Sequence, residues 1–436
     1  MIRFLLCCVS NLLIILFSST AFSQGAPNII WSQAAHTNSV ESIAFSSDGQ
    51  KVVSSGGQEV KLWQASDGML LQTISGFPSD VESIDLAHNN IHLAAGYIVG
   101  TYPPGGVNSV RDINQGIELY SFGGSYVKFS PNGGIIASGG GGVNRYLTLH
   151  SISDGSQIGS YYNGPGYITD IEFSPDGQIV AVSNTRNEVK LWDISSGTVI
   201  RTLTGHTDDV RCITFSPDGQ MLAGGAGGWD DPNDATIKLW QVSDGSLVNT
   251  LPGHGDWVSD VVFSPDGQLL LSSGRDGLYP NVNSKIKIWR IYDGLLLQYY
   301  DQEVNNGAQS LDVSPDGQVF CYGRGDGMVV VATIPNVTGI KDNISELVPG
   351  TVQLYQNFPN PFNPTTQIKF SIPEATQVKL EIFNMLGERV NVLVNQLVTA
   401  GEHTIQWNAS QVPSGIYAYR LTAGSHIKSM KMVLLR

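Results

Sequence analysis

The hexapeptide FSPDGQ stands at residues 173–178 and returns unchanged at 215–220 and 263–268. Three near-copies read FSSDGQ at 45–50, FSPNGG at 129–134 and VSPDGQ at 313–318. A tight hairpin turn requires positive φ, which Gly and Asp tolerate. An Asp-Gly pair after a short apolar run therefore predicts the end of a strand followed by a hairpin turn.

The copies recur at a regular period. Aligned on the Phe or its equivalent, they are 41 to 50 residues apart. The aligned residues are Phe45, Leu86, Phe129, Phe173, Phe215, Phe263 and Val313. A period of this length is typical of propellers and solenoids, and four short apolar runs joined by Gly turns are typical of one propeller blade. Seven copies therefore predict an all-β protein with a seven-bladed β-propeller.

The seventh copy has no fourth apolar run. Its third run, MVVVATIPN, passes directly into the tail, whereas NIIWSQAAH at residues 28–36 precedes the first copy and belongs to no blade. Pairing this segment with the seventh blade would close the ring and remove two sheet edges. We therefore expect Ile29 to Ser32 to form the outer strand of blade 7.

Two further features recur in these periods. The third run often ends in Trp and the first run is often preceded by Gly-His, at Trp63, Trp192, Trp240, Trp289, Gly205, His206, Gly253 and His254. With these features, residues 28–335 resemble the WD-repeat family. The resemblance implies a hydrogen-bonded structural network of His, Asp and Trp in a blade, which blade 5 retains as His206, Asp234 and Trp240. Blade 6 has Asn283 in the place of the Asp.

The repeat is interrupted between the second and third runs of four copies, at residues 97–116, 139–145, 227–234 and 275–284. Strands alternate in direction, so these insertions and the connections after the fourth strands should share one face, which in repeat proteins is often the binding face. Aromatic and Arg side chains anchor many interfaces. The candidate partner-binding residues on this face are Tyr97, Tyr102, Arg111, Trp229, Asp230, Asp231, Trp257, Arg275 and Tyr279.

Several alternatives remain open. The inserted loops could be solvent-exposed segments that bind no partner. The alternative to a binding protein is a propeller enzyme, a hydrolase or lyase that acts on a glycan or peptide in the central pocket of this face. Asp230, Asp231 and Asp234 offer oxygen ligands for a hard cation, but they lack the spacing of a known site. Arg324-Gly325-Asp326 stands where a turn belongs. We expect no catalytic residue, no metal and no cofactor.

The first residues are typical of export. Arg3 precedes an apolar run, and Ala21-Phe22-Ser23 fits a small-x-small cleavage site, so residues 1–23 are predicted to be a secretory signal peptide. The apolar run is too short for a spanning helix, and we expect no transmembrane segment after cleavage.

The net charge of −14 is unevenly placed. Residues 337–436 carry eight Lys/Arg and six Asp/Glu, which makes +2 and leaves −16 for the rest of the chain. An acidic body repels a phosphate backbone, so we expect no nucleic-acid partner. Cys212 and Cys321 lie in strand-like runs and are interpreted as small buried hydrophobes.

The repeat stops after Pro335, and alternating apolar residues return in several short runs. Such runs predict a small Ig-like β-sandwich. The segments NFPNPFNP, IFNMLGERV, GEHTIQWN, SGIYAYRL and KMVLL, in this order, resemble the type A C-terminal sorting domain of the type IX secretion system of Bacteroidetes-like bacteria. The resemblance implies passage through the periplasm and recognition of residues 355–436 by the type IX secretion machinery. An ordinary Ig-like domain that binds or spaces is the alternative.

The predicted organisation is a signal peptide at residues 1–23, a seven-bladed WD-type β-propeller at 24–336, a linker at 337–354 and a C-terminal sorting β-sandwich at 355–436. The expected function is that of a secreted or cell-surface, non-catalytic scaffold. Its propeller would bind a protein or carbohydrate partner through the face that carries the inserted loops.

Overall fold

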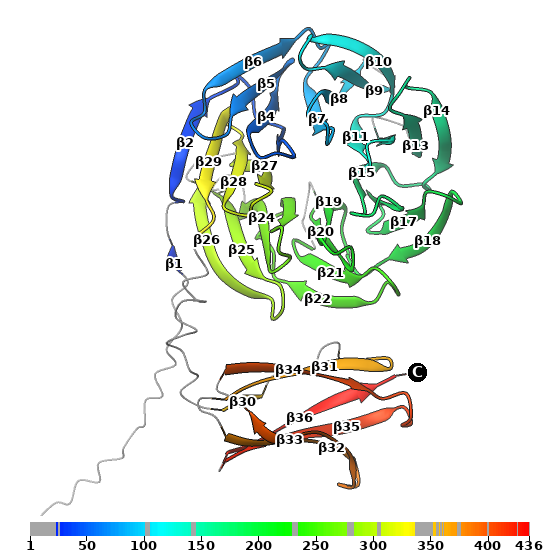
Figure 1. The fold of residues 1–436 in the computed structure, drawn as a ribbon. Coiled ribbons are helices and arrows are strands. Elements are labelled where there is room, and N and C mark those ends of the chain that lie inside the picture. The colour runs from blue at the N-terminus through cyan, green and yellow to red at the C-terminus, as the bar shows by residue number, and fades with distance from the viewer. Residues whose placement is uncertain are drawn as a thin grey trace, which may run out of the picture. The chain divides into compact units, whose positions relative to one another are not determined.

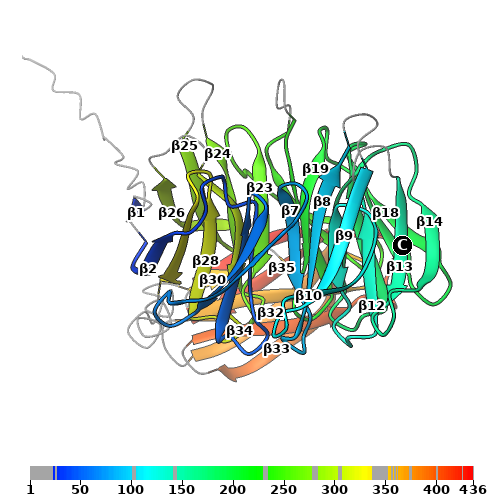
Figure 2. The same cartoon turned by 90° about the horizontal axis from the view of Figure 1, so that it is seen from above.

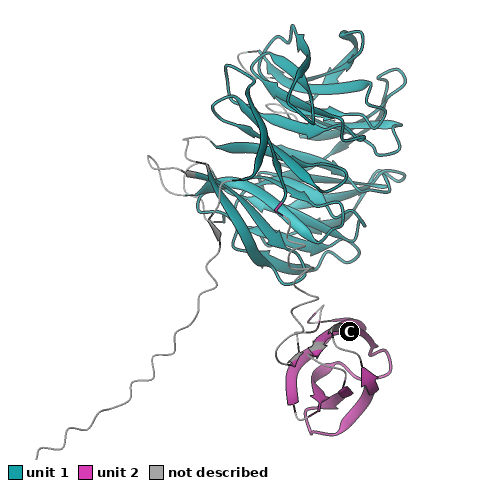
Figure 3. Cartoon of the chain, turned by 60° about the vertical axis from the view of Figure 1, so that its left-hand side comes forward, with its two compact units in different colours: residues 1–334 teal, residues 335–436 magenta. Residues whose placement is uncertain are grey.

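The computed structural model comprises residues 1–436. It describes residues 23–24, 27–100, 105–140, 145–228, 234–276, 283–302, 307–335, 352–354, 357, 360, 362–372, 376–398, 401–424 and 426–435. The secondary structure of these residues is made of strands, and among them there is no helix long and apolar enough to cross a membrane. The chain divides into two compact units, residues 1–334 and residues 335–436 (Figure 3).

In the described residues, the first unit holds seven sheets arranged as a ring, each with four antiparallel strands and one with a short fifth strand (Figure 1). The predicted all-β fold with seven blades is confirmed. Blades 1 to 3 consist of β3 (Ser42–Phe45), β4 (Lys51–Gly56), β5 (Glu59–Gln64), β6 (Leu70–Ser75); β7 (Val81–Leu86), β8 (His92–Val99), β9 (Gly105–Asp112), β10 (Ile117–Gly123); and β11 (Tyr126–Phe129), β12 (Ile135–Gly139), β13 (Tyr146–Ser151), β14 (Gln157–Tyr162).

Blades 4 to 6 repeat this order of strands, from the axis outward. They consist of β15 (Ile168–Phe173), β16 (Ile179–Asn184), β17 (Val189–Asp193), β18 (Thr198–Leu203); β19 (Val210–Phe215), β20 (Met221–Ala226), β21 (Ile237–Gln241), β22 (Leu247–Leu251); and β23 (Val258–Phe263), β24 (Leu269–Asp276), β25 (Asn283–Arg290), β26 (Leu295–Gln302). The short strand β1 (Ser23–Gln24) adds to the outer edge of β26 in parallel.

Blade 7 combines the two ends of the first unit. Its strands are β27 (Ala308–Val313), β28 (Val319–Arg324), β29 (Met328–Thr333) and, at the outer edge, β2 (Ile29–Ala34), which runs antiparallel to β29. The predicted closure by Ile29 to Ser32 is confirmed. The buried Trp31 reinforces it, because its Nε1 donates to Ala65 O of blade 1 at 2.7 Å.

The recurring hexapeptide is a hairpin turn held by its own side chains. In the copy that begins at Phe173, Ser174 Oγ donates to Asp176 Oδ1 at 2.6 Å and accepts from Ile179 N at 2.9 Å. Gly177 has a φ of 69°, which favours glycine. The hydrogen bond from Ser174 is the main reason that the pKa of Asp176 is lowered. The same Ser-to-Asp bond of 2.6 Å recurs in four other copies, so the turn explains the repetition.

Blade 2 departs from the sequence prediction. With residues 97–116 read as an insertion between the second and third runs, the sequence predicts the third strand in the run that follows, IELY at 117–120, but Gly105–Asp112 is the third strand and Ile117–Gly123 the fourth. The prediction is wrong because the inserted residues lengthen the hairpin of β8 and β9, which pair over eight residues each. Arg111 therefore lies in a strand, at the position that Trp63 holds in blade 1.

Aspartate side chains of innermost strands connect four pairs of neighbouring blades among the described residues. The first strand of a blade lies nearest the axis and has no strand on its inner side (Figure 1). Carboxylates supply the missing acceptors for its backbone N–H groups, which would otherwise be unpaired. Phe129 N donates to Asp85 Oδ2 at 2.7 Å, Ile213 N to Asp170 Oδ2 at 2.9 Å, Leu311 N to Asp260 Oδ2 at 2.9 Å and Phe45 N to Asp312 Oδ2 at 2.7 Å.

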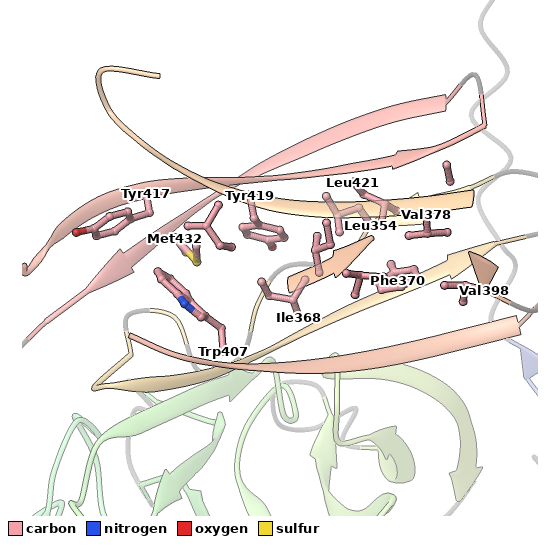
Figure 4. Close-up of a cluster of buried hydrophobic side chains, with 14 of the residues drawn as sticks. Leu354, Ile368, Phe370, Val378, Val398, Trp407, Tyr417, Tyr419, Leu421 and Met432 are labelled. Carbon is pink, nitrogen blue, oxygen red and sulfur yellow. The ribbon is translucent and has the colours of Figure 1, made fainter. Parts of the chain in front are cut away.

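The second unit is a sandwich of two sheets around one hydrophobic core (Figure 4). One sheet has the order β30 (Gln353–Leu354), β31 (Thr365–Ile372), β34 (Gly401–Asn408), and the other the order β33 (Arg389–Val398), β32 (Thr376–Asn384), β35 (Gly415–Ala423), β36 (His426–Leu434). Ile368 and Trp407 from the first sheet face Tyr419 and Met432 from the second. Residues 352–354 belong to this core, so the sandwich starts before the predicted residue 355.

Candidate functional site

The connections from second to third strands and from fourth to first strands emerge at one end of the ring, because the strands of a blade alternate in direction (Figure 2). We call this end the loop face. The structure describes four of the nine candidate residues, Tyr97, Arg111, Trp257 and Arg275. The other five, Tyr102, Trp229, Asp230, Asp231 and Tyr279, lie outside the described residues.

Trp257 lies between two arginines near the inner strands of blades 5 and 6. The guanidinium carbon of Arg275 is 4.0 Å from the centroid of the Trp257 ring, and that of Arg211 is 4.9 Å away. Trp257 is only 8% exposed, and a Cβ on Gly227 would collide with it. Arg211 Nε donates to Gly227 O at 2.7 Å, and Arg275 Nε is 3.5 Å from Asp256 Oδ2. The structure thus brings Trp257 and Arg275 together as a packed stack.

Tyr97 and Arg111 lie in blade 2 and meet at Phe77. The Arg111 guanidinium carbon is 4.0 Å from the centroid of the Phe77 ring, and the Tyr97 ring contacts Phe77 edge-on at 5.9 Å. Arg111 Nη1 also donates to Ser75 O at 3.0 Å. Tyr97 is 5% exposed, so both residues fill the interior of the blade and have little surface to offer.

The three residues of the expected network in blade 5 lie together. His206 Nδ1 is 2.8 Å from Asp234 Oδ2, and its Nε2 is 3.1 Å from Gly224 O. Hydrogen bonds from His206 and Thr236 lower the pKa of Asp234, against the effect of its burial. Trp240 contacts the His206 ring edge-on at 5.4 Å, while its Nε1 donates to Thr204 O at 3.0 Å.

Blades 1 and 6 build a related network through a serine. In blade 6, Ser272 Oγ accepts from Trp289 Nε1 at 2.9 Å and lies 3.0 Å from His254 Nε2. The carboxylate near His254 comes from Asp276, 3.6 Å from its Nδ1, and not from the predicted position of Asn283. Asp276 can supply this carboxylate because it is the register partner of Asn283 in the β24–β25 pair.

In blade 1, Ser54 Oγ joins His36 and Trp63 in the same way, at 2.9 Å from each. Glu59 supplies the carboxylate, with its Oε1 3.5 Å from His36 Nδ1. Sequence reasoning missed Glu59 and Asp276. In both blades a serine lies two residues after the residue that pairs with the Trp across the sheet. This serine is the sequence signal that indicates the related network.

A cluster of carboxylates surrounds Lys128 close to the axis. Lys128 Nζ is 3.2 Å from Glu172 Oε2 and 3.9 Å from Asp85 Oδ1. Burial raises the pKa of Asp170 to about 7 and those of Asp85 and Asp260 to about 6. These three aspartates also accept backbone hydrogen bonds from the next blade. Hydrogen bonding between neighbouring blades therefore explains why these aspartates lie near the axis.

Two other sequence features have structural settings. Within the described residues, no group of three or more His, Cys, Asp or Glu side chains is arranged to hold a metal ion. Arg324 ends β28 and forms an ion pair at 2.6 Å with Asp326 in the turn before β29, so the tripeptide stands at a turn, as expected. Cys212 and Cys321 are buried free thiols, which confirms their interpretation as core residues.

Family comparisons agree with this architecture. The chain matches the WD domain, G-beta repeat, at residues 28–64, 197–241 and 245–290, and the WD40 domain of anaphase-promoting complex subunit 4 at 156–218. The secretion system C-terminal sorting domain matches residues 356–435.

Curated relatives match parts of the chain. Autophagy-related protein 16 of Arabidopsis thaliana is 34% identical over 94 residues, or 22% of this chain and 18% of the relative. Guanine nucleotide-binding protein subunit beta-5b of Danio rerio is 29% identical over 211 residues, or 46% of this chain and 51% of the relative. Eukaryotic translation initiation factor 3 subunit I of Pyricularia oryzae is 32% identical over 76 residues, or 17% and 22%.

The matched segments thus span between about a fifth and about half of these relatives' own lengths. Both resemblances indicated by the sequence are confirmed by the family matches. The chain carries WD repeats within residues 28–290, as part of a seven-bladed propeller, and a secretion-system C-terminal sorting domain at residues 356–435.

Proposed function

We propose that this protein is an exported, non-catalytic scaffold. Its propeller binds a protein or glycan partner through the loop face, and its C-terminal sandwich directs export through the periplasm to the outer surface or the medium of a Bacteroidetes-like bacterium. The WD repeats support a role in protein interaction, and the sorting domain supports secretion by the type IX machinery.

The contrast between the two ends of the ring carries the binding part of the proposal. The hexapeptide turns between first and second strands repeat almost unchanged at one end, whereas insertions of different length interrupt the repeat at the loop face. Loops of variable sequence on a rigid scaffold are where binding residues concentrate. Insertions that map to one face of a repeat protein often mark its binding face.

The charged groups near the axis favour a scaffold over the enzyme alternative. A glycoside hydrolase needs two carboxylates free to act on substrate at a set separation. Asp85, Asp170, Asp260 and Asp312 each accept a backbone hydrogen bond from the neighbouring blade, and Glu172 pairs with Lys128. Connecting neighbouring blades is a structural role that explains these groups without catalysis.

A capture experiment tests the binding role. Residues 24–436 serve as bait for a glycan panel and for an extract of surface proteins. A Trp229→Ala, Tyr279→Ala double variant should weaken capture by about tenfold or more, as expected for interface anchors. The control is Tyr292→Ala, which removes a half-exposed ring near the turn between third and fourth strands, at the opposite end. Capture that is equal in both variants would remove the loop face from consideration.

Deletion of residues 355–436 tests the export role. We expect the truncated chain to remain in the periplasm of a host with type IX secretion, because the sorting domain spans residues 356–435. Cell fractionation and protease shaving of intact cells measure its location. Fusion of an unrelated sorting domain to the truncated chain is the control and should restore export. Normal surface delivery of the truncated chain would contradict the role.

A further inference from the structure

Three exposed tyrosines gather on the loop face at blades 3 and 4. Tyr146 begins β13, Tyr162 ends β14, and Tyr167 immediately precedes β15, so all three lie at the loop-face ends of their strands. Their exposed fractions are 47%, 53% and 43%. Tyr97 and Trp257, the described aromatic candidates from the sequence, are below 10% exposed. These tyrosines therefore offer ring surface that the predicted candidates do not.

Arg145 ties the tyrosines into one patch. Its guanidinium carbon is 5.1 Å from the centroid of the Tyr167 ring, and hydrogen bonding with Tyr167 and then Tyr162 raises its pKa. The Tyr146 and Tyr162 rings lie 5.4 Å apart. The stem of Arg186 lies beside the backbone that leads into Tyr167, because a Cβ on Gly166 would be 2.9 Å from the Arg186 Cγ, and we include Arg186 on this ground. We call these residues, Arg145, Tyr146, Tyr162, Tyr167 and Arg186, the tyrosine–arginine patch.

The backbone under the patch is held firmly. Asn163, which is fully buried, donates its N–H to Arg145 O at 2.9 Å and accepts from Trp192 Nε1 at 3.2 Å. Tyr167 N donates to Thr185 Oγ1, and Thr185 N donates to Tyr167 O, both at 3.0 Å. A patch that is ordered before binding loses little conformational entropy when a partner docks.

The charge of the patch is opposite to that of the whole protein. Within the described part of the chain, neither Arg145 nor Arg186 has a carboxylate oxygen within ion-pair distance, although the chain carries a net charge of −14. Nearby Lys190 differs, since Glu188 lies 3.4 Å from it. The net negative charge of the chain repels an acidic partner, whereas the two guanidinium groups, for which the described residues offer no carboxylate partner, attract it and can bind carboxylates in bidentate fashion.

We propose that the tyrosine–arginine patch is a docking site for an acidic, aromatic-containing segment of a partner protein. The inference rests on the proposed partner-binding function and assigns it a location and a ligand chemistry. Tyr and Arg are among the side chains that most often anchor protein–protein contacts, and the WD repeats also favour a protein partner. The two arginines take the carboxylates, and the tyrosine rings take the apolar and aromatic groups between them.

Binding of soluble polymers to residues 24–436 tests the proposal. The probes are a random glutamate–tyrosine copolymer, polyglutamate and the acidic polysaccharide polygalacturonate. We expect the copolymer to bind most tightly and its affinity to fall as salt is raised. An Arg145→Gln, Arg186→Gln variant and a Tyr162→Ala, Tyr167→Ala variant should each weaken binding by about tenfold or more.

Matched controls separate the patch from general charge and exposure. Arg201→Gln and Tyr292→Ala remove an exposed arginine and an exposed tyrosine away from the patch, and copolymer binding should stay within about twofold of the parent. Thermal unfolding of each variant verifies its fold. Equal copolymer affinity in patch and control variants overturns the proposal, and so does tighter binding of polygalacturonate that depends on the same residues.

The same variants distinguish this inference from the proposed function. A surface partner whose capture depends on Trp229 and Tyr279, but not on the patch, would leave the loop face as the binding face and refute the patch. A captured partner lost in the patch variants and competed by the copolymer supports both.

Discussion

Blade 6 and blade 2 fill the same space beneath the loop face with different chemistry. In blade 6, Ser272 connects the buried rings of His254 and Trp289 by hydrogen bonds of 3.0 and 2.9 Å. In blade 2, the guanidinium of Arg111 lies over the ring of Phe77 at 4.0 Å. Arg111 and Trp289 hold equivalent register positions, because each lies opposite a leucine that is the second residue of the neighbouring strand, Leu93 in β8 and Leu270 in β24.

The difference indicates that side chains of suitable size can fill this site in a blade with different types of interaction. Blade 2 has Ala95 where blade 6 has Ser272, so no hydroxyl is present to connect two polar rings. The Arg111 guanidinium over the Phe77 ring fills the site instead. Its charge is stabilised by hydrogen bonds that it donates to Ser75 O and Ser109 Oγ. We therefore expect residues at these positions to stabilise the ring in both blades, by different interactions.

The largest expected effect comes from emptying the blade 6 site. Trp289 is 2% exposed, and Trp289→Ala should cost about 3–5 kcal/mol of unfolding free energy through lost burial and a cavity. Trp289→Phe retains most of the volume and should cost clearly less. Urea unfolding followed by circular dichroism measures both. Equal costs for the two substitutions would mean that the hydrogen bond, and not the volume, stabilises this blade.

Removing the connecting hydroxyl should have the next largest effect. Ser272→Ala leaves Trp289 Nε1 buried without its acceptor and removes the contact to His254, at a cost of about 2–3 kcal/mol. The matched control is Ala95→Ser in blade 2. Blade 2 has no His or Trp at the two ring positions to bond the new hydroxyl, so the substitution should not raise the unfolding free energy. A stabilising Ala95→Ser would show that the two blades differ less than their contacts indicate.

The two blades should also respond differently to acid. Burial, and then the charge of Lys287, lowers the pKa of His254 to about 3, from about 6.5 in the unfolded chain. Between these values the unfolded state binds a proton that the folded state does not, so His254 lowers stability as pH falls below 6.5, by about 1 kcal/mol per pH unit. Phe77 holds the equivalent position in blade 2 and cannot titrate.

A His254→Phe variant measures this contribution. Its stability relative to the parent should improve steadily as pH falls from 7 to 4, because all other titrating groups are shared by the two proteins. The aspartates near the axis, whose pKa values are raised, act in the opposite direction and cancel in the comparison. A difference in unfolding free energy that does not change with pH would contradict the prediction.

The smallest expected effect is the loss of the cation in blade 2. Arg111→Met keeps most of the apolar stem against Phe77 and removes the guanidinium, at a cost of about 1 kcal/mol. Urea unfolding is the measurement, and Arg201→Met on an outer strand is the control. A cost as large as that of Ser272→Ala would mean that stacking and hydrogen bonding hold their blades equally well.

The candidate site was less predictable than the fold. The sequence places Trp257 and Arg275 near one face, and they do pack together, but as a buried stack with Arg211. No sequence pattern distinguishes Tyr146 and Tyr162, because they occupy ordinary strand positions. Exposure depends on which neighbours cover a ring, and those neighbours come from other strands or, as with Arg211 beside Trp257, from another blade, so composition and loop length cannot predict it.

The sequence by itself determined the number of blades, the closure by β2 and the second β domain. The blade number and the second domain follow from short-range patterns, since the Ser-Asp-Gly turn and the alternating strands depend on residues close together in the chain. The closure follows from the count of apolar runs, because the seventh copy lacks a fourth run and β2 belongs to no other blade. Only the tertiary structure decided that Arg111 is a strand residue and that Asp276 replaces Asn283. Those outcomes depend on register and on contacts between strands, where one hydrogen bond or one packed ring selects among residues that the sequence leaves equivalent.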